Sequence, residues 1–229
     1  MVWLPEVHDS DGLLIHSQND EMIWRPFYNH FAIRESRYYA RDVDGFGVLQ
    51  RDRKFENYED LSNPYWKTPT AWVEPQTSWG DGVIRLVELP TNNEAMDNIV
   101  AYFEPAVPPV AGDEMHYSYN LSWMLHEEVA LSPNRVLATR VGEIGAFPDT
   151  RRFMIDFIGP DLEAMTADAP MFAEITSSAN GYVTENQCFK NVKTGGWRVE
   201  FKLDTDDSNV HPVELKCILR DPETGKALS

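Results

Sequence analysis

Apolar and polar residues alternate along several short stretches of the chain, which is the pattern of β-strands with one buried face. Every second residue is apolar in residues 117–123 (YSYNLSW), 153–157 (FMIDF) and 199–203 (VEFKL), and residues 83–87 (VIRLV) are rich in β-branched side chains. The longest helical candidate, residues 161–167 (DLEAMTA), allows only one or two turns. The pattern therefore predicts an all-β fold.

Residues 104–114 (EPAVPPVAGDE) interrupt this alternation with three prolines and a glycine, and proline cannot donate a hydrogen bond to a strand ladder. We predict a proline-rich linker over residues 104–115. Beyond it, residues 116–229 contain short alternating segments separated by turns, which predicts an immunoglobulin-like β-sandwich domain. Residues 1–103 are rich in aromatic residues and turns but show few strands, which is typical of one part of a larger β-sandwich. The strands predicted after the linker lie near residues 116–125, 135–141, 151–158, 182–190, 197–204 and 213–220.

The composition excludes several classes of protein. Hydrophobic residues make up 42% of the 229 residues, which is enough for a packed core. No apolar run reaches the roughly 18 residues of a membrane span, so no membrane insertion is expected. The net charge of −17 disfavours nucleic acid and anionic lipid as partners, whereas a neutral ligand such as a sugar is not repelled. The two cysteines form no CxxC pair, and His8 and His16 lack a third ligand at metal-site spacing, so neither a metal nor a cofactor is expected.

Aromatic and acidic residues are interleaved in the first 105 residues. Aromatic faces stack on the apolar faces of sugar rings, and carboxylates accept hydrogen bonds from sugar hydroxyls, so this composition suits a carbohydrate site. The alternative is that most of the tryptophans belong to the core. Five of the seven tryptophans of the chain lie here: Trp3, Trp24, Trp66, Trp72 and Trp79.

Carboxylate pairs are too numerous for composition to identify a catalytic pair. Cleavage of a glycosidic bond needs one protonated acid and one carboxylate that activates water or attacks the sugar. Asp9 and Asp11 lie in the turn sequence HDSDG, and Asp97 lies in a loop before the apolar residues 99–103. Because aspartate favours turns for its local hydrogen bonding, spacing alone favours a turn-forming role for each of them over a catalytic one.

Five segments in a fixed order carry a resemblance to one protein family. They are residues 5–17 (PEVHDSDGLLIHS), 23–27 (IWRPF), 45–61 (GFGVLQRDRKFENYEDL), 72–91, which contain WVEP and SWGDGVIRLVELPT, and 97–103 (DNIVAYF). Over nearly all of its length the chain resembles the periplasmic glucans biosynthesis protein family of the MdoG/OpgG and OpgD type, in the C-terminal portion of that family's chain.

The resemblance implies a fold and a compartment. Members of the family are periplasmic and have a large β-sandwich that resembles the galactose-mutarotase sandwich, then a linker and an immunoglobulin-like domain. Residues 1–103 would then be the C-terminal part of the large glucan-binding sandwich, truncated at its N-terminus and without a signal peptide. An incomplete sandwich leaves strand edges and an inner face unpaired, so self-association through exposed sheet surface is also expected.

The resemblance also implies a chemistry. The family acts on osmoregulated periplasmic glucans, whose backbone is β-1,2-linked glucose, and some members resemble inverting β-1,2-glucanases. By this resemblance Asp97 matches the general acid, Asp9 matches the general base, and Tyr65 matches a relay between the base and its water. The further residues expected to contact the glucan are Glu94, Trp24, Arg25, Trp72, Trp79 and His8.

Three functions stay open on the sequence alone. The first is an inverting enzyme that hydrolyses or remodels β-1,2-glucan. The second is a non-catalytic glucan-binding or scaffolding protein of the periplasm. The third is an inactive, truncated remnant of such a protein. Binding of linear β-1,2-glucan, measured together with the release of reducing ends, separates the three.

Overall fold

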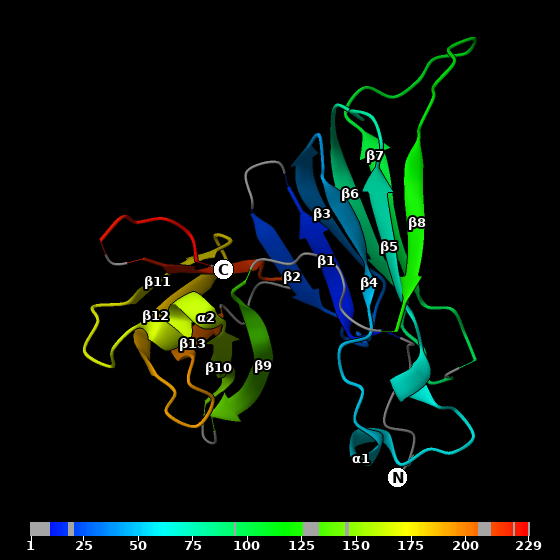
Figure 1. Ribbon diagram of the computed structural model, residues 1–229. Helices are drawn as coiled ribbons and strands as arrows, with labels where there is room; N and C mark the ends of the chain where they lie inside the picture. Colours follow the sequence, from blue (N-terminus) through cyan, green and yellow to red (C-terminus); the bar gives the residue numbers. More distant parts are fainter. Residues whose placement is uncertain are drawn as a thin grey trace. The chain divides into compact units, whose positions relative to one another are not determined.

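The chain folds into two compact units made almost entirely of antiparallel strands, which confirms the predicted all-β fold (Figure 1). The computed structural model describes residues 10–17, 21–93, 95–125, 133–144, 147–205, 212–221 and 223–228. Unit 1 comprises Met1–Ala130 and unit 2 comprises Leu131–Ser229. In the described part of the chain, no helix is long and apolar enough to span a membrane.

Unit 1 contains two sheets. The first has the strand order β2-β1-β4-β5-β8, and the second has the order β3-β6-β7. The strands of the first sheet are β1 (Gly12–His16), β2 (Met22–Pro26), β4 (Gly45–Leu49), β5 (Thr70–Pro75) and β8 (Tyr119–Met124). The strands of the second sheet are β3 (Arg34–Arg41), β6 (Asp81–Glu88) and β7 (Ile99–Pro105). Two short helices, α1 (Phe55–Tyr58) and η1 (Tyr65–Lys67), lie between β4 and β5.

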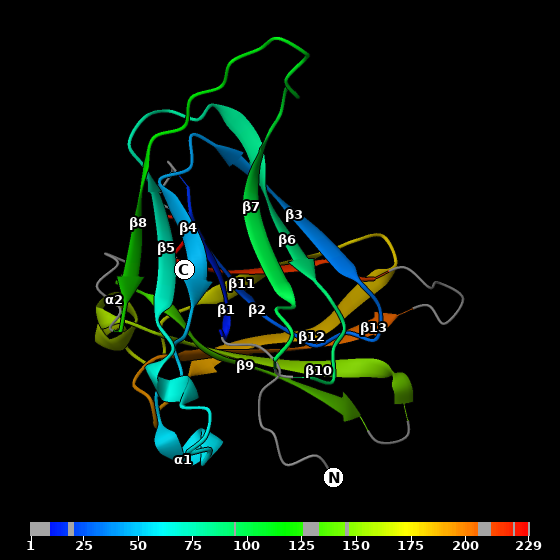
Figure 2. The same ribbon diagram turned by 90° about the vertical axis from the view of Figure 1, so that its right-hand side faces the viewer.

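The two sheets of unit 1 pack against each other as layers of a β-sandwich (Figure 2). Leu13 and Ile15 of β1 and Phe46 of β4 share a buried cluster with Ile84 and Leu86 of β6. Because side chains alternate between the two faces of a strand, residues spaced by two enter the same core, and this accounts for the period in the sequence.

The division of the chain falls later than the predicted linker. Residues 116–125 were predicted to begin the second domain, but β8 is the outermost strand of the first sheet in unit 1 and pairs with β5 in the register Trp72↔Ser122. The prolines of residues 104–115 end β7 and shape a loop within unit 1. Proline stops a strand, but it does not by itself end a domain.

Residues 12–105 also form more strands than the pattern indicated, because glycine and proline interrupt the alternation in β2 and β4.

The inner face of the first sheet is exposed at β8. Tyr119, Leu121 and Trp123 of β8 point to the same side as Val73 of β5, which packs on the core. These three side chains are nevertheless 52%, 49% and 65% exposed. Among the described strands, none pairs with the outer edge of β8 or of β7. We call Tyr119, Leu121 and Trp123 the β8 stripe.

The β8 stripe predicts self-association of the chain. An apolar inner face beside two open strand edges favours contact with another β-surface. The double substitution Leu121→Glu and Trp123→Glu should shift the protein toward monomer in sedimentation velocity at micromolar concentration. Val192→Glu, at an 80% exposed turn position of unit 2, is the matched control and should change nothing. A wild-type chain that is monomeric across the concentration series would contradict this prediction.

Unit 2 also contains two sheets. The larger has the order β12-β13-β10-β9, and the smaller pairs β11 with β14. Their strands are β9 (Arg135–Ile144), β10 (Phe147–Ile158), β11 (Phe172–Ser177), β12 (Gly181–Lys190), β13 (Trp197–Thr205) and β14 (Leu215–Arg220). The hairpin predicted at residues 191–197 joins β12 to β13, and the short helix predicted at 161–167 is α2 (Pro160–Ala164). β11 was not predicted.

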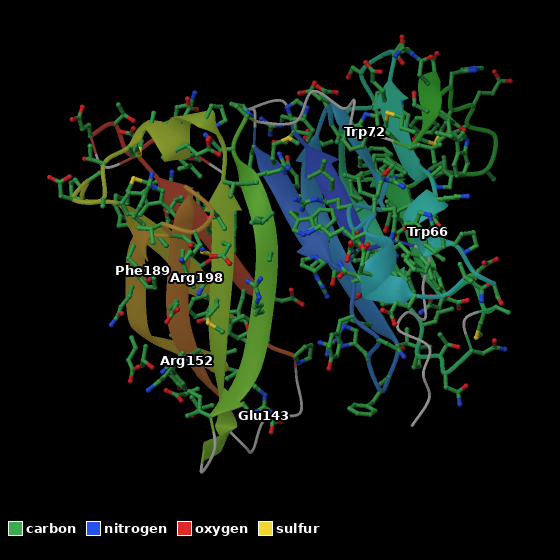
Figure 3. All side chains as sticks on the ribbon, turned by 60° about the horizontal axis from the view of Figure 1, so that its bottom comes forward. Trp66, Trp72, Glu143, Arg152, Phe189 and Arg198 are labelled. Atoms are coloured by element: carbon green, nitrogen blue, oxygen red, sulfur yellow. The ribbon has the colours of Figure 1, made fainter. Side chains whose placement is uncertain are left out.

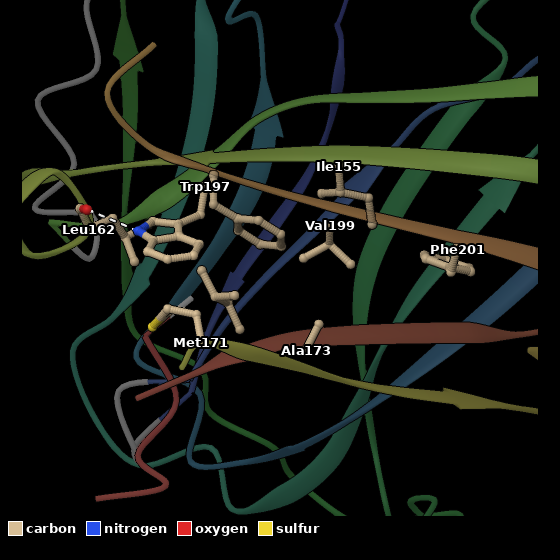
Figure 4. Packing of buried hydrophobic residues seen from close by; sticks show 9 residues of the cluster. Ile155, Leu162, Met171, Ala173, Trp197, Val199 and Phe201 are labelled. Carbon is tan, nitrogen blue, oxygen red and sulfur yellow. Dashed lines mark hydrogen bonds between the residues drawn. The ribbon is translucent and has the colours of Figure 1, made fainter. Parts of the chain in front are cut away.

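The core of unit 2 lies around Trp197 (Figure 4). Val199 and Phe201 follow it along β13, and Ile155 of β10 and Ala173 of β11 complete the contact between the two sheets. The indole Nε1 donates a hydrogen bond to the carbonyl oxygen of Leu162 at 3.1 Å, which satisfies the one polar atom of the buried ring. Apolar burial of this kind is the main stabilising contribution in a domain of this size.

A charged cluster occupies the opposite face of β10 in unit 2. The Asp156 carboxylate, 2% exposed, accepts hydrogen bonds from Arg140, from the Nε and Nη2 atoms of Arg198, and from Asn191, at 2.7–2.9 Å. Figure 3 shows Arg198 on the ribbon of this sheet. Burial alone would raise the pKa of Asp156, but these hydrogen bonds outweigh it, so that the pKa lies below its ordinary value.

The lowered pKa of Asp156 predicts how the stability of unit 2 depends on pH. A carboxyl group whose pKa falls on folding stabilises the fold above its unfolded value, and that contribution is lost as the pH falls from about 4 through the folded pKa. Asp156→Asn should lower the free energy of unfolding by about 2 kcal/mol at pH 7 and by much less near pH 2. Urea unfolding at both pH values measures this. The same deficit at both, or an equal effect of Glu200→Gln, would contradict it.

Candidate functional site

Several polar loops gather at one end of unit 1. The strand registers place Gly12 opposite Pro26 and Leu49 in the first sheet, and Glu88 opposite Arg34 and Ile99 in the second. The segments 27–33, 50–69 and 89–98 therefore leave their sheets at the same end, the one that carries α1 in Figure 1. We call these three segments the loop end of unit 1.

Glu88 joins the two sheets at the loop end. It is in phase with Ile84 and Leu86 on β6, so its side chain enters the sandwich and is only 2% exposed. Its Oε2 atom lies 3.0 Å from Nη2 of Arg25 on β2, and its Oε1 atom accepts a 3.0 Å hydrogen bond from the backbone N–H of Tyr28. A buried carboxylate is tolerated only when paired and hydrogen-bonded in this way.

His30 also faces this carboxylate. Its Nε2 atom lies 3.3 Å from Oε2 of Glu88, within ion-pair distance. Burial lowers the pKa of His30, and the negative charge of Glu88 opposes that shift. Arg25, predicted to contact substrate, is therefore held by Glu88 and links the sheets at the base of the loop end.

Loop 27–33 and loop 89–98 are tied together beyond Glu88. Asn29 and Thr91 exchange two hydrogen bonds: the Asn29 amide donates to the Thr91 carbonyl oxygen at 2.5 Å, and the Thr91 N–H donates to Oδ1 of Asn29 at 3.1 Å. The base of loop 89–98 is closed by the buried side chain of Asn98, which donates to the carbonyl oxygen of Leu89 at 3.2 Å. The two loops thus form one fixed surface.

Asp97 lies in this surface and is exposed to solvent. The turn hydrogen bonds of its loop come from Thr91, Asn93 and Asn98. Among the described residues, the Asp97 carboxylate itself makes no hydrogen bond or ion pair. The turn-forming role that spacing alone favoured is therefore not what its side chain does, and its oxygen atoms are available to a ligand.

Tyr65 lies in the folded segment between β4 and β5. It begins η1, is 4% exposed, and its ring centroid lies 5.5 Å from that of Tyr58. The Tyr58 hydroxyl accepts a 2.7 Å hydrogen bond from the buried side chain of Gln50, and Arg53 holds the carbonyl oxygens of residues 66 and 68. Residues 50–69 have no neighbouring strand to pair with. Their backbone groups are instead hydrogen-bonded by polar side chains of the same segment.

Asp11 connects the start of β1 to this segment. Its Oδ2 atom accepts hydrogen bonds from the backbone N–H groups of Arg51 and Asp52. The Asp11 carboxylate thus accepts hydrogen bonds from backbone N–H groups about 40 positions away along the chain. Burial raises the pKa of Asp11, although the two amide hydrogen bonds oppose the shift.

Trp24 and Trp72 lie on the outer face of the first sheet. Their rings cover glycines of the neighbouring strands: a Cβ atom at Gly12 would lie 2.6 Å from the Trp24 ring, and one at Gly45 would overlap the Trp72 ring. Trp72 is 7% exposed, and Figure 3 marks it on β5. The Arg51 guanidinium lies 4.4 Å from the centroid of the Trp24 ring, a cation–π contact that places Trp24 beside the loop end.

Trp79 lies at the opposite end of unit 1. It precedes Asp81, where β6 begins, whereas Glu88 ends that strand. Its ring packs 5.3 Å from Phe103 and 5.3 Å from Tyr117, and its edge meets Tyr119. The structure therefore does not bring Trp79 together with Asp97. Three further predicted residues, His8, Asp9 and Glu94, lie outside the described residues.

The loop end carries aromatic side chains, polar side chains and charged side chains of both signs. It offers the carboxylate of Asp97, backbone and amide groups of two tied loops, and aromatic rings at their rims. In the described part of the chain, no group of three or more His, Cys, Asp or Glu side chains is arranged to hold a metal ion. A ligand rich in hydroxyl groups and apolar ring faces fits such a surface.

The family of the chain follows from a comparison with known families. A family model described as periplasmic glucan biosynthesis protein, MdoG, matches residues 2–229. The chain belongs to this MdoG family. The resemblance seen in the sequence is thereby confirmed, and the MdoG match includes every segment of the loop end.

Curated relatives of the MdoG family carry the name Glucans biosynthesis protein G. The relative from Pseudomonas entomophila (strain L48) is 36% identical over 231 residues, which are 96% of this chain and 40% of that protein. The relative from Pectobacterium atrosepticum is 38% identical over 230 residues, which are 96% of this chain and 44% of that protein. The chain thus spans about two fifths of the length of the curated relatives it matches, in their C-terminal portion.

The residues that sequence reasoning missed are Glu88, Asn29 and His30. Glu88 carried a usable signal, because it continues the inward phase of Ile84 and Leu86 and a charged residue in that phase must find a buried partner. Asn29 and His30 carried none, because their partners lie about 60 positions away along the chain.

Proposed function

We propose that the loop end of unit 1 binds the β-1,2-linked glucan backbone of osmoregulated periplasmic glucans, and that the protein acts in the periplasm. The observation that carries the proposal is the exposed carboxylate of Asp97 on a fixed double loop, which no other described residue engages, in a chain of the MdoG family. The net charge of −17 also suits a neutral glucan better than an anionic ligand.

The mechanism we propose is inverting hydrolysis. Asp97 as general acid would protonate the leaving glycosidic oxygen as its bond to the anomeric carbon breaks. Asp9 as general base would take a proton from the water whose oxygen bonds to that carbon on the opposite face of the sugar. Tyr65 would relay that proton where the base and the water are not in direct contact. Inversion requires room for the water, so we expect the two carboxyl groups to stand about 6.5–9.5 Å apart, or farther with the relay.

A second candidate is a non-catalytic glucan-binding or scaffolding protein. It is favoured by the name of the relatives, Glucans biosynthesis protein G, which states a role in biosynthesis rather than in hydrolysis. Both candidates place the glucan at the loop end and differ only in turnover.

Calorimetric titration of the chain with linear β-1,2-glucan, beside a reducing-end assay, tests the proposal. Binding with release of reducing ends supports the enzyme, and binding without release supports the scaffolding protein. Linear β-1,3-glucan is the matched control ligand, since it has the same monomer and charge. Equal binding of both glucans, or binding of neither, would contradict the proposal.

A further inference from the structure

Loop 27–33 (FYNHFAI) exposes aromatic side chains at the loop end. Phe27 is 8% exposed and packs on the core, but Tyr28 is 64% exposed and Phe31 is fully exposed. Exposed aromatic rings beside a polar surface suit contact with a ligand that has both apolar faces and hydroxyl groups, so loop 27–33 is a candidate contact.

The backbone that presents these rings is fixed at three points. The Phe27 N–H donates to the carbonyl oxygen of Asp11 at 2.9 Å, and the Tyr28 N–H donates to buried Glu88 at 3.0 Å. The Asn29–Thr91 pair then ties the loop to loop 89–98. Because the backbone is already ordered, binding through the rings loses little loop freedom.

We propose that Tyr28 and Phe31 form a stacking subsite for a glucosyl unit of a glucan bound at the loop that carries Asp97. This inference rests on the proposed function and deepens it. Phe31 offers only an apolar face, and Tyr28 adds one hydroxyl, a combination that suits the C–H face and hydroxyl rim of a neutral pyranose. The Tyr28 and His30 rings lie 5.1 Å apart at 58°, so the largely buried His30 ring supports the Tyr28 ring from one side.

The β8 stripe, rather than loop 27–33, is the surface we assign to protein contacts. The stripe belongs to an open sheet face with unpaired strand edges, where another β-surface can continue the fold. Loop 27–33 has no such edge: the backbone N–H groups of Phe27 and Tyr28 donate to Asp11 and Glu88, and the Asn29 side chain pairs with Thr91. Two of its exposed side chains are the Tyr28 and Phe31 rings, which favours a sugar as the occupant.

Alanine substitution in the full chain tests the subsite. Tyr28→Ala and Phe31→Ala should each weaken binding of linear β-1,2-glucan oligosaccharides about fivefold in calorimetric titration, and the double variant about 25-fold. Tyr39→Ala is the matched control, because Tyr39 is 63% exposed but lies on β3 away from the loop end, and it should leave the affinity unchanged. The melting temperature of the two single variants, the double variant and the control should equal that of the wild-type chain.

The outcomes separate this inference from the proposed function. A wild-type chain that binds the glucan while the double variant binds equally well overturns the subsite and leaves the proposed function intact. A wild-type chain that binds no β-1,2-glucan overturns both. A double variant that loses self-association in sedimentation, but keeps its glucan affinity, assigns the loop to a protein contact and overturns the subsite alone.

Discussion

Asp97→Asn is expected to lower the rate of β-1,2-glucan hydrolysis about 10²–10⁴-fold, the usual contribution of a positioned acid, and to change glucan affinity less than about threefold. Asparagine keeps the shape and the hydrogen-bonding capacity of the side chain but cannot donate the proton that the leaving oxygen needs. The loop should fold unchanged, because its turns are made by Thr91, Asn93 and Asn98.

The rate is measured in two proteins, since the chain spans about two fifths of its relatives. One is the chain itself, and the other is a chimera in which it replaces the matching portion of Glucans biosynthesis protein G from Pectobacterium atrosepticum. Asp81→Asn is the control, because Asp81 lies at the opposite end of β6. Full activity of Asp97→Asn in whichever protein is active would remove Asp97 from the acid role.

Glu88→Ala is expected to lower the free energy of unfolding of unit 1 by about 2–4 kcal/mol. This is less than for a fully buried ion pair, because the Arg25 side chain is still 26% exposed. The change removes the partner of the Arg25 guanidinium and leaves the Tyr28 N–H without its acceptor. Hydrogen exchange at Tyr28 and Thr91 should accelerate, because both loops lose their common anchor.

Two further variants separate the buried pair from ordinary surface charge. Arg25→Leu with Glu88→Leu should cost less than the sum of the single changes, because neither charge is left without its opposite charge and only the Tyr28 N–H still loses its acceptor. Asp81→Ala removes a carboxylate that is 51% exposed and pairs with the exposed Arg41, so it should cost less than about 1 kcal/mol. Equal costs for Glu88→Ala and Asp81→Ala in urea unfolding would contradict the anchoring role of Glu88.

The sequence predicted which faces of the strands are buried but not which strands become neighbours. Ile155, Phe157, Val199 and Phe201 alternate and are buried as expected. The alternation in β8 is equally regular, yet it was assigned to the wrong domain, because a period of two identifies an inner face without identifying the sheet that the strand joins.

Only part of the candidate site was predictable, because a sequence pattern does not show which strands and loops become neighbours. The family resemblance placed Trp72 and Trp79 at one glucan site, but the chain reverses direction between β5 and β6, so that Trp79 lies at the far end of the sheets from Asp97. Arg25 was identified as important, but its partner Glu88 lies 63 positions away and only the fold brings the two together. Neither spacing nor composition shows that the Asp97 carboxylate is engaged by no other residue in the part of the chain that the structure describes.

The most direct test of the glucan site at the loop end is backbone amide NMR of the isotope-labelled chain, titrated with linear β-1,2-glucan. We predict that the shifted signals belong to residues 27–33, 50–69 and 89–98, with the largest changes near Asp97, and that residues 76–80 and 106–118 at the opposite end of unit 1 keep their positions. Shifts confined to the Trp79 end or to unit 2, or a spectrum that the glucan leaves unchanged, would contradict the site.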